Sequence, residues 1–341
     1  GILIGRDSYI DVGENWLITG SGVFTCGTST VRLTSNAGTR TIDPGASNFY
    51  NLTTGGVAIF RLSDNTIIEN DLDIQSGTLD MSSFPSYNLT VTGNWTNSGT
   101  FNERLGTVTF NGGNQTLTNT AVETFYGLTL NNTSLTLVSA NMNVTNTLTM
   151  TSGNIDAGTN RVILGTSTSN TGTLTYNSGT IIGEFERWIN ALGTDYEFPV
   201  GTVTNNNRAT FRFLSGLTSG SLIVELISTD PGTSGLPLDD GGYTINASFP
   251  DGYWNVTASN SLACTDYNIT LNGTGFTSVY TIDANTRIIK RTNGGDWQLD
   301  GSHSAASAPD CYRNGLNGIS TLGTQFGLGL RACEGGTIDN T

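Results

Sequence analysis

Three aspartates in one long loop have the clearest capacity for chemistry in this chain. Asp230, Asp239 and Asp240 lie in the segment 230–242, which also carries two prolines and ends in a Gly-Gly turn. Carboxylates on an oxygen-rich loop suit a hard cation such as Ca²⁺, although the spacing matches neither an EF-hand nor a calcium-binding nonapeptide repeat. We therefore expect no cofactor, and calcium at these three residues is the alternative.

A second acidic group was considered for catalysis. Glu69, Asp71 and Asp73 form the densest acidic stripe of the N-terminal half, and glycoside cleavage needs two carboxylates at a defined separation. A sequence repeat places threonines at the equivalent positions 76 residues later, which is typical of a solvated face. These threonines are Thr145, Thr147 and Thr149. The stripe is therefore interpreted as surface.

The remaining inventory for acid-base or nucleophilic chemistry is poor. His303 is the single histidine and lies in a run of small residues, so we interpret it as a surface side chain. No nucleophile elbow, phosphate-binding loop or His/Cys metal cluster is present in the sequence. Trp254, Trp297 and Tyr253 could stack on sugar rings, but they are expected to be core and edge residues. We therefore expect that the chain has no catalytic residues and that the protein is not an enzyme.

These residues belong to a chain with an internal repeat. Residues 49–81 and 125–157 share one pattern at a constant offset of 76. Upstream of this pattern, two aromatic residues of the first copy recur in the second at slightly different offsets. Trp16 corresponds to Trp95, and Phe24 corresponds to Phe101. A repeat of this size indicates stacked structural units.

Composition and strand patterning predict an all-β fold. The chain of 341 residues has 44 glycines and only 12% charged residues, and short alternating Thr-rich stretches recur without helical periods. For residues 1–183 we predict a parallel, β-helix-like solenoid with roughly four coils per repeat. A meandering sandwich is the alternative. For residues 184–330 we predict an antiparallel β-sandwich of eight or nine strands, followed by a polar tail at 331–341.

Charge and cysteine content restrict the cellular setting. A net charge of −14 and a pI near 4.3 exclude a basic nucleic-acid-binding surface, and no apolar run is long enough to insert in a membrane. The chain begins at Gly1, as expected of a processed product or a fragment. Four cysteines suit one or two disulfides in a secreted protein, and the pairing stays open. These are Cys26, Cys264, Cys311 and Cys333.

Several segments resemble a known kind of protein. Gly93–Phe101, Gly106–Gly112 and Phe125–Asn132 are similar to repeats of large, secreted, adhesin-like surface proteins of the Bacteroidota and Ignavibacteria. Phe198–Gly201 and Asp251–Trp254 are similar to the sandwich module that often follows such repeats. The resemblance implies a solenoid followed by a sandwich at the cell surface. Such proteins usually end in a sorting domain for type IX secretion, which is absent from this sequence.

These observations lead to an expected function. We expect an extracellular structural or adhesive protein that is a homo-oligomer or homopolymer, in which one subunit adds a strand to the next as in a surface filament. The expected assembly residues are Ile2, Leu3, Ile4, Tyr9, Ile10 and Val12, with the tail segment 335–341 as a further candidate. Surface glycans are candidate partners. A carbohydrate-binding or polysaccharide-cleaving β-helix protein is the alternative.

Overall fold

Strands make up all of the regular secondary structure. The structure, a computed structural model, describes residues 1–332 and contains no helix in that range, so no helix there could cross a membrane. The predicted all-β fold is confirmed.

The chain divides into a first compact unit, residues 1–166 with 170–181, and a second unit of residues 167–169 with the chain from 182 onward. The sequence had placed the boundary between residues 183 and 184. Most of the predicted 331–341 tail lies outside the described residues.

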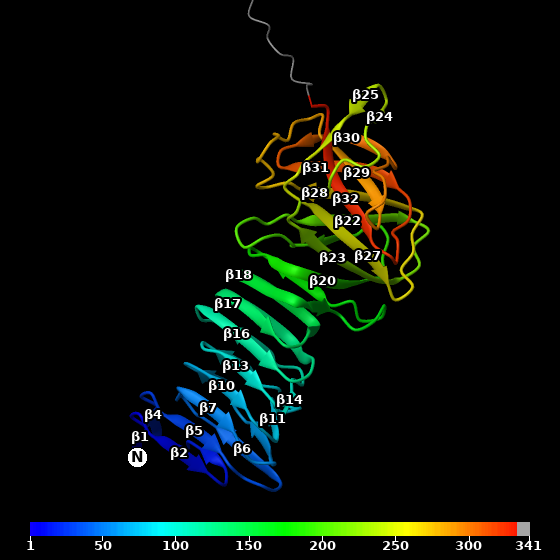
Figure 1. Cartoon of the computed structure of the whole chain (residues 1–341). Coiled ribbons are helices and arrows are strands. Elements are labelled where there is room, and N and C mark those ends of the chain that lie inside the picture. The colour runs from blue at the N-terminus through cyan, green and yellow to red at the C-terminus, as the bar shows by residue number, and fades with distance from the viewer. Residues whose placement is uncertain (333–341) are drawn as a thin grey trace, which may run out of the picture. The chain divides into compact units, whose positions relative to one another are not determined.

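The first unit is a parallel β-solenoid of about nine turns, as predicted. Its strands stack one above another from β2 to β18 (Figure 1). They are β1 (Ile2–Ile4), β2 (Tyr9–Val12), β3 (Trp16–Leu17), β4 (Val23–Thr25), β5 (Thr30–Leu33), β6 (Thr39–Asp43), β7 (Asn51–Thr54), β8 (Ile59–Leu62), β9 (Thr66–Ile68), β10 (Leu72–Ile74), β11 (Thr78–Asp80), β12 (Leu89–Val91), β13 (Trp95–Asn97), β14 (Thr100–Asn102), β15 (Thr107–Phe110), β16 (Asn114–Asn119), β17 (Glu123–Val138), β18 (Met142–Leu164) and β19 (Thr173–Tyr176).

Three stacks of parallel strands form the sides of the solenoid. The first face contains β2, β5, β7, β10, β13 and β16 and continues into β17. The second face contains β9, β12, β15, the middle parts of β17 and β18, and β19. The third face contains β3, β6, β8, β11 and β14. Alternate side chains point inward, so rows such as Leu52, Leu72 and Trp95 pair in register and are fully buried.

Aromatic clusters inside the solenoid confirm the repeat. In the first copy, the ring of Trp16 lies 4.9 Å from Phe24 and 5.3 Å from Phe49. In the second copy, Trp95 has its two counterparts, Phe101 and Phe125, at 4.8 and 5.5 Å. Edge-to-face contacts at such distances stabilise a core beyond simple burial. The two copies thus preserve a buried packing unit.

Turn residues also recur between the copies. Gly77 and Gly153 occupy equivalent positions and have φ angles of +72° and +91°, a backbone region that favours glycine. Three residues later, Asp80 and Asp156 each accept a hydrogen bond from the amide two residues ahead, at 2.8 and 3.1 Å. Both features are typical of positions where the chain changes direction. The repeat therefore encodes turns as well as core residues.

The two copies do not occupy the same face of the solenoid. Leu52 and Leu72 pair on the first face, whereas their counterparts Leu128 and Leu148 pair on the second face. The repeat spans one strand fewer than four complete turns, so each copy is displaced by one face. Equivalent residues of the two copies are therefore buried in the same way, but they lie on different faces of the solenoid.

The second unit consists mainly of two antiparallel sheets and a small hairpin. Its strands are β20 (Ile181–Ile189), β21 (Asp195–Phe198), β22 (Ala209–Ser215), β23 (Gly220–Ile227), β24 (Leu238–Asp240), β25 (Tyr243–Ile245), β26 (Ala247–Ser248), β27 (Tyr253–Ser259), β28 (Asp266–Asn272), β29 (Arg287–Thr292), β30 (Ser302–Ser307), β31 (Asp310–Leu316) and β32 (Thr324–Leu330). One sheet has the order β20-β23-β27-β32-β29, and the other has the order β21-β22-β28-β31-β30.

Aromatic side chains fill the space between these two sheets. Phe211 of β22 lies 6.2 Å from Phe326 of β32, and Phe185 of β20 lies 5.7 Å from Phe198 of β21. Each pair joins one sheet to the other, so the predicted antiparallel sandwich is observed. Trp254 and Trp297 are also buried, which confirms their interpretation as core residues.

Candidate functional site

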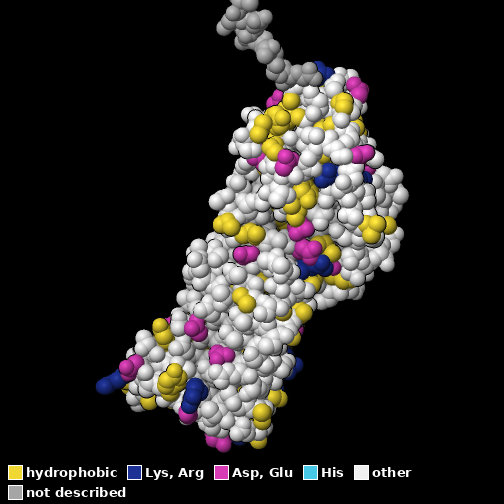
Figure 2. Space-filling view, viewed as in Figure 1, with side chains coloured by type: hydrophobic (Ala, Val, Ile, Leu, Met, Phe, Trp, Pro, Cys, Tyr) yellow, Lys and Arg dark blue, Asp and Glu magenta, His cyan; other side chains and the backbone are white. Residues whose placement is uncertain are grey.

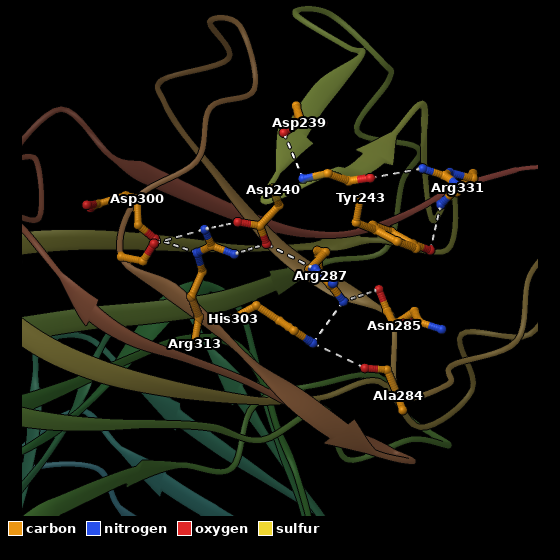
Figure 3. A network of polar contacts seen from close by, with 12 residues as sticks. Asp239, Asp240, Tyr243, Ala284, Asn285, Arg287, Asp300, His303, Arg313 and Arg331 are labelled. Carbon is orange, nitrogen blue, oxygen red and sulfur yellow. Dashed lines mark hydrogen bonds and ion pairs between the residues drawn. The ribbon is translucent and has the colours of Figure 1, made fainter.

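The three aspartates expected to bind calcium make separate interactions. Asp230 and Asp239 accept hydrogen bonds from the amides of Gly232 and Gly242 at 2.8 and 3.0 Å, so both stabilise local turns. Asp240 points instead toward buried arginines (Figure 3). Among residues 1–332 no group of three His, Cys, Asp or Glu side chains could hold a metal ion. The geometry does not assemble the expected calcium site.

Asp240 neutralises two arginines beneath the hairpin formed by β24 and β25. Arg313 is 1% exposed, and its two terminal nitrogens lie 3.2 and 3.4 Å from the two carboxylate oxygens. The Nε of Arg287 lies 3.0 Å from Asp240 Oδ2. The Arg287 guanidinium also packs 4.3 Å from the ring centre of Tyr243, which belongs to the same hairpin. This ion cluster therefore fixes the hairpin to the sandwich.

His303 belongs to this ion cluster and is half-buried, which corrects its interpretation as a surface side chain. Its Nε2 lies 2.8 Å from Arg287 Nη1, which can only donate, and 3.2 Å from the carbonyl oxygen of Ala284, which can only accept. Burial and the neighbouring Arg287 charge lower the pKa of His303 below its usual value. The histidine thus contacts both Arg287 and the Ala284 carbonyl, which is a structural role.

The acidic stripe on the solenoid is also fully engaged. Asp71 accepts a hydrogen bond from the Asn94 amide at 2.7 Å, and Asp73 accepts one from the Gln75 side chain at 2.7 Å. Both line a polar groove of about 550 Å³ on the first face. Glu69 lies elsewhere and contacts the side chains of Asn48, at 2.9 Å, and Cys26, at 3.6 Å. The three carboxylates therefore do not form one acid-base site.

The expected assembly residues lie in the first turn of the solenoid. Ile2, Leu3 and Ile4 of β1 are 72%, 47% and 58% exposed, and β1 pairs only with β4. Tyr9 of β2 is 72% exposed, whereas the other two assembly residues, Ile10 and Val12, are half-buried against the next turn. Along the edge opposite these pairings, strands β1 and β2 have no partner within residues 1–332. The first turn thus presents an open strand edge with apolar side chains.

The cysteines that the structure describes are not paired. Cys26, Cys264 and Cys311 are free thiols, and the last two are buried in the second unit. Burial raises the pKa of Cys264 to about 11 and that of Cys311 to about 12, so both are inert at neutral pH. The prediction of disulfides among these three residues is wrong, and Cys333 lies outside the described residues.

A polar cleft that the sequence analysis missed lies beside β14. The third-face sheet ends at this strand, because β14 pairs with β11 and the next turn, Glu123–Phe125, pairs with β18. The interruption leaves a cleft of about 290 Å³ lined by residues 97–103 and 119–124. A cleft produced by a local break in strand pairing could not be foreseen from repeat spacing alone.

Glu123 is the buried carboxyl group of this cleft. The side chain is 4% exposed, and its Oε2 accepts hydrogen bonds from Trp95 Nε1 at 3.0 Å and from Asn97 Nδ2 at 2.8 Å. Burial raises the pKa of Glu123 to about 7, despite these two hydrogen bonds. A buried carboxyl with a shifted pKa in a cleft is characteristic of functional sites. The sequence did contain one indication of this burial. Glu123 lies two residues before Phe125, and side chains two residues apart in a strand point to the same side, which here is the core.

A second polar group of the cleft lacks a partner. Asn119 is 3% exposed and donates from Nδ2 to the carbonyl of Ala121. Its Oδ1 is buried and has no hydrogen-bond partner among the described residues. A buried acceptor without a donor is costly, so ligand or water donors would stabilise it.

Comparison with known proteins adds no assignment. No protein-family model matches the chain, no curated protein is significantly similar to it, and no solved structure matches it significantly. The resemblance to adhesin-like surface proteins therefore stays a prediction from motifs.

Proposed function

We propose that this protein is an extracellular structural and adhesive protein whose subunits associate through the first turn of the solenoid. In this proposal a second copy of the chain adds strands to the open edges of β1 and β2 and forms a homopolymer. The observation that carries the proposal is the exposure of Ile2, Ile4 and Tyr9 on those edges. Unpaired strands with apolar side chains are templates for another chain.

The character of the surface supports a structural role. Charged side chains are few and scattered over the visible face (Figure 2), and the chain contains 12% charged residues. The carboxylates of the first-face groove are occupied by neighbouring groups. We therefore favour a non-enzymatic protein. A polysaccharide-cleaving protein is the weaker candidate, and a screen for product release from polysaccharides would test it directly.

The test is to measure assembly as a function of concentration. Light scattering and negative-stain electron microscopy of the 341-residue chain should show growing head-to-tail particles. Replacing two exposed residues, Ile2→Lys and Ile4→Lys together, should prevent growth, because buried lysines would lose their hydration. Leu105→Lys is the matched control, since Leu105 is exposed elsewhere on the solenoid. A chain that stays monomeric at high concentration, or growth that survives the double substitution, would contradict the proposal.

A further inference from the structure

The two copies of the repeat provide an internal control for the role of Glu123. In the first copy, the position of Glu123 is occupied by Ser47, whose hydroxyl accepts a hydrogen bond from the Phe24 amide at 2.9 Å. The indole Nε1 of Trp16 is then buried and has no hydrogen-bond partner among residues 1–332. The same aromatic cluster therefore forms without a carboxyl group. Packing of this cluster does not require Glu123, although burial of a carboxyl costs free energy.

The chemistry of the cleft indicates a ligand rich in hydroxyl groups. Asn119 Oδ1 requires a hydrogen-bond donor, and Glu123 can donate when protonated and accept when ionised. The lining also includes the hydroxyl side chains of Thr100 and Thr124, the aromatic residue Phe101 and the second carboxylate, Glu103. Sugar hydroxyls both donate and accept, and sugar rings have apolar faces that contact aromatic rings. A volume of about 290 Å³ is at the small end of ligand pockets and suits one sugar ring.

The groove on the first face offers less to such a ligand. Its carboxylates Asp71 and Asp73 are hydrogen-bonded to neighbours, and Arg32 forms two short contacts, 2.6 and 2.7 Å, with Asp11. A ligand there would have to replace interactions that already exist. At the cleft beside β14, a ligand would instead donate a hydrogen bond to Asn119 Oδ1, which has no partner in the described part of the chain.

We propose that the cleft beside β14 binds a single sugar unit of a glycan, with Asn119 Oδ1 and the Glu123 carboxyl as its main hydrogen-bonding groups. The inference goes beyond the proposed assembly and rests on the proposed adhesive function only for its biological setting. The cleft is lined by one subunit alone. Binding can therefore be measured on the assembly-blocked double variant, which separates failure of this proposal from failure of the assembly proposal.

The test is a titration with a panel of neutral mono- and disaccharides. Saturation-transfer NMR and the tryptophan fluorescence, to which Trp95 beside Glu123 contributes as one of five tryptophans, should report binding of at least one sugar. Glu123→Gln keeps an acceptor for Trp95, so it should fold and yet bind about tenfold more weakly. Asn119→Ala should lose a similar factor, and Asn119→Asp, which keeps an acceptor oxygen, should retain more binding. Asp73→Asn is the matched control on the first face and should bind normally.

Three outcomes would overturn the proposal. The first is that no sugar of the panel binds to a folded protein, with folding checked by circular dichroism. The second is that sugars bind but lose affinity only in Asp73→Asn, which would locate the site in the first-face groove. The third is a fluorescence response to Ca²⁺ and not to sugars that disappears in Glu123→Gln, which would make the cleft a cation site.

Discussion

At the scale of single residues, the buried carboxyl of Glu123 couples folding of the solenoid to proton binding. Its pKa is raised from 4.5 to about 7 in the folded state. Below pH 4.5 the group is protonated in both states and imposes no penalty. Between these two values the folded protein holds a proton that the unfolded chain has lost. The free energy of unfolding therefore falls as pH rises through this window.

Glu123→Gln should abolish this pH dependence. The loss of stability in the wild type, between pH 4.5 and pH 7, is about 3 kcal/mol from the size of the pKa shift. The glutamine variant has no proton to lose, so it should be more stable than wild type at pH 8 and similar at pH 4. Urea denaturation at both pH values measures the difference. Glu14→Gln, at an exposed position, should leave the pH profile unchanged, and an unchanged profile in Glu123→Gln would refute the linkage.

At the scale of structural elements, the β24–β25 hairpin depends on one carboxylate. Asp240→Asn should destabilise the second unit by about 3 kcal/mol or more, because two buried arginines would lose their counter-charge. The adjacent Asp239→Asn is the matched control and should cost far less, since an amide oxygen can still accept from Gly242. Thermal unfolding of both variants gives the comparison. Equal melting temperatures for the two would show that the ion cluster contributes little.

The same elements show what the sequence could and could not predict. The repeat predicted the solenoid correctly because Trp16 and Trp95, with their partner rings, must occupy equivalent places in a core. The repeat correctly predicted that Asp71 and Asp73, like their counterparts Thr147 and Thr149, point away from the core. It did not predict that the second copy is displaced to another face of the solenoid. The displacement arises because the repeat spans one strand fewer than four complete turns, and no local pattern records this.

Functional groups were harder to predict than the fold for a related reason. The three loop aspartates are close in sequence, but the partners of Asp240 lie 47 and 73 residues downstream, at Arg287 and Arg313. A long-range ion pair leaves no signal in local spacing. Glu123 escaped notice because the clear part of the repeat begins at Phe125, two residues later. Glu123 is buried beside β14, where strand pairing is interrupted, and this interruption depends on how successive turns of the solenoid stack.

At the scale of the whole molecule, charge opposes association and apolar edges favour it. Each chain carries a net charge of −14, so copies repel one another at low ionic strength. Association through Ile2, Ile4 and their neighbours buries apolar surface, which salt does not screen. Added salt should therefore shift the balance toward assembly, and the shift should be absent when the edge is blocked.

Light scattering across a salt series measures this balance. From about 0.01 M to about 1 M ionic strength the Debye length falls from about 30 Å to about 3 Å, so repulsion between subunits is almost completely screened. The average mass of the wild type should rise over this range, while the Ile2→Lys and Ile4→Lys double variant should stay monomeric. The comparison also separates specific from general aggregation, because both proteins share the same sandwich and nearly the same charge. If both gain mass equally, the association surface lies elsewhere than on the first turn.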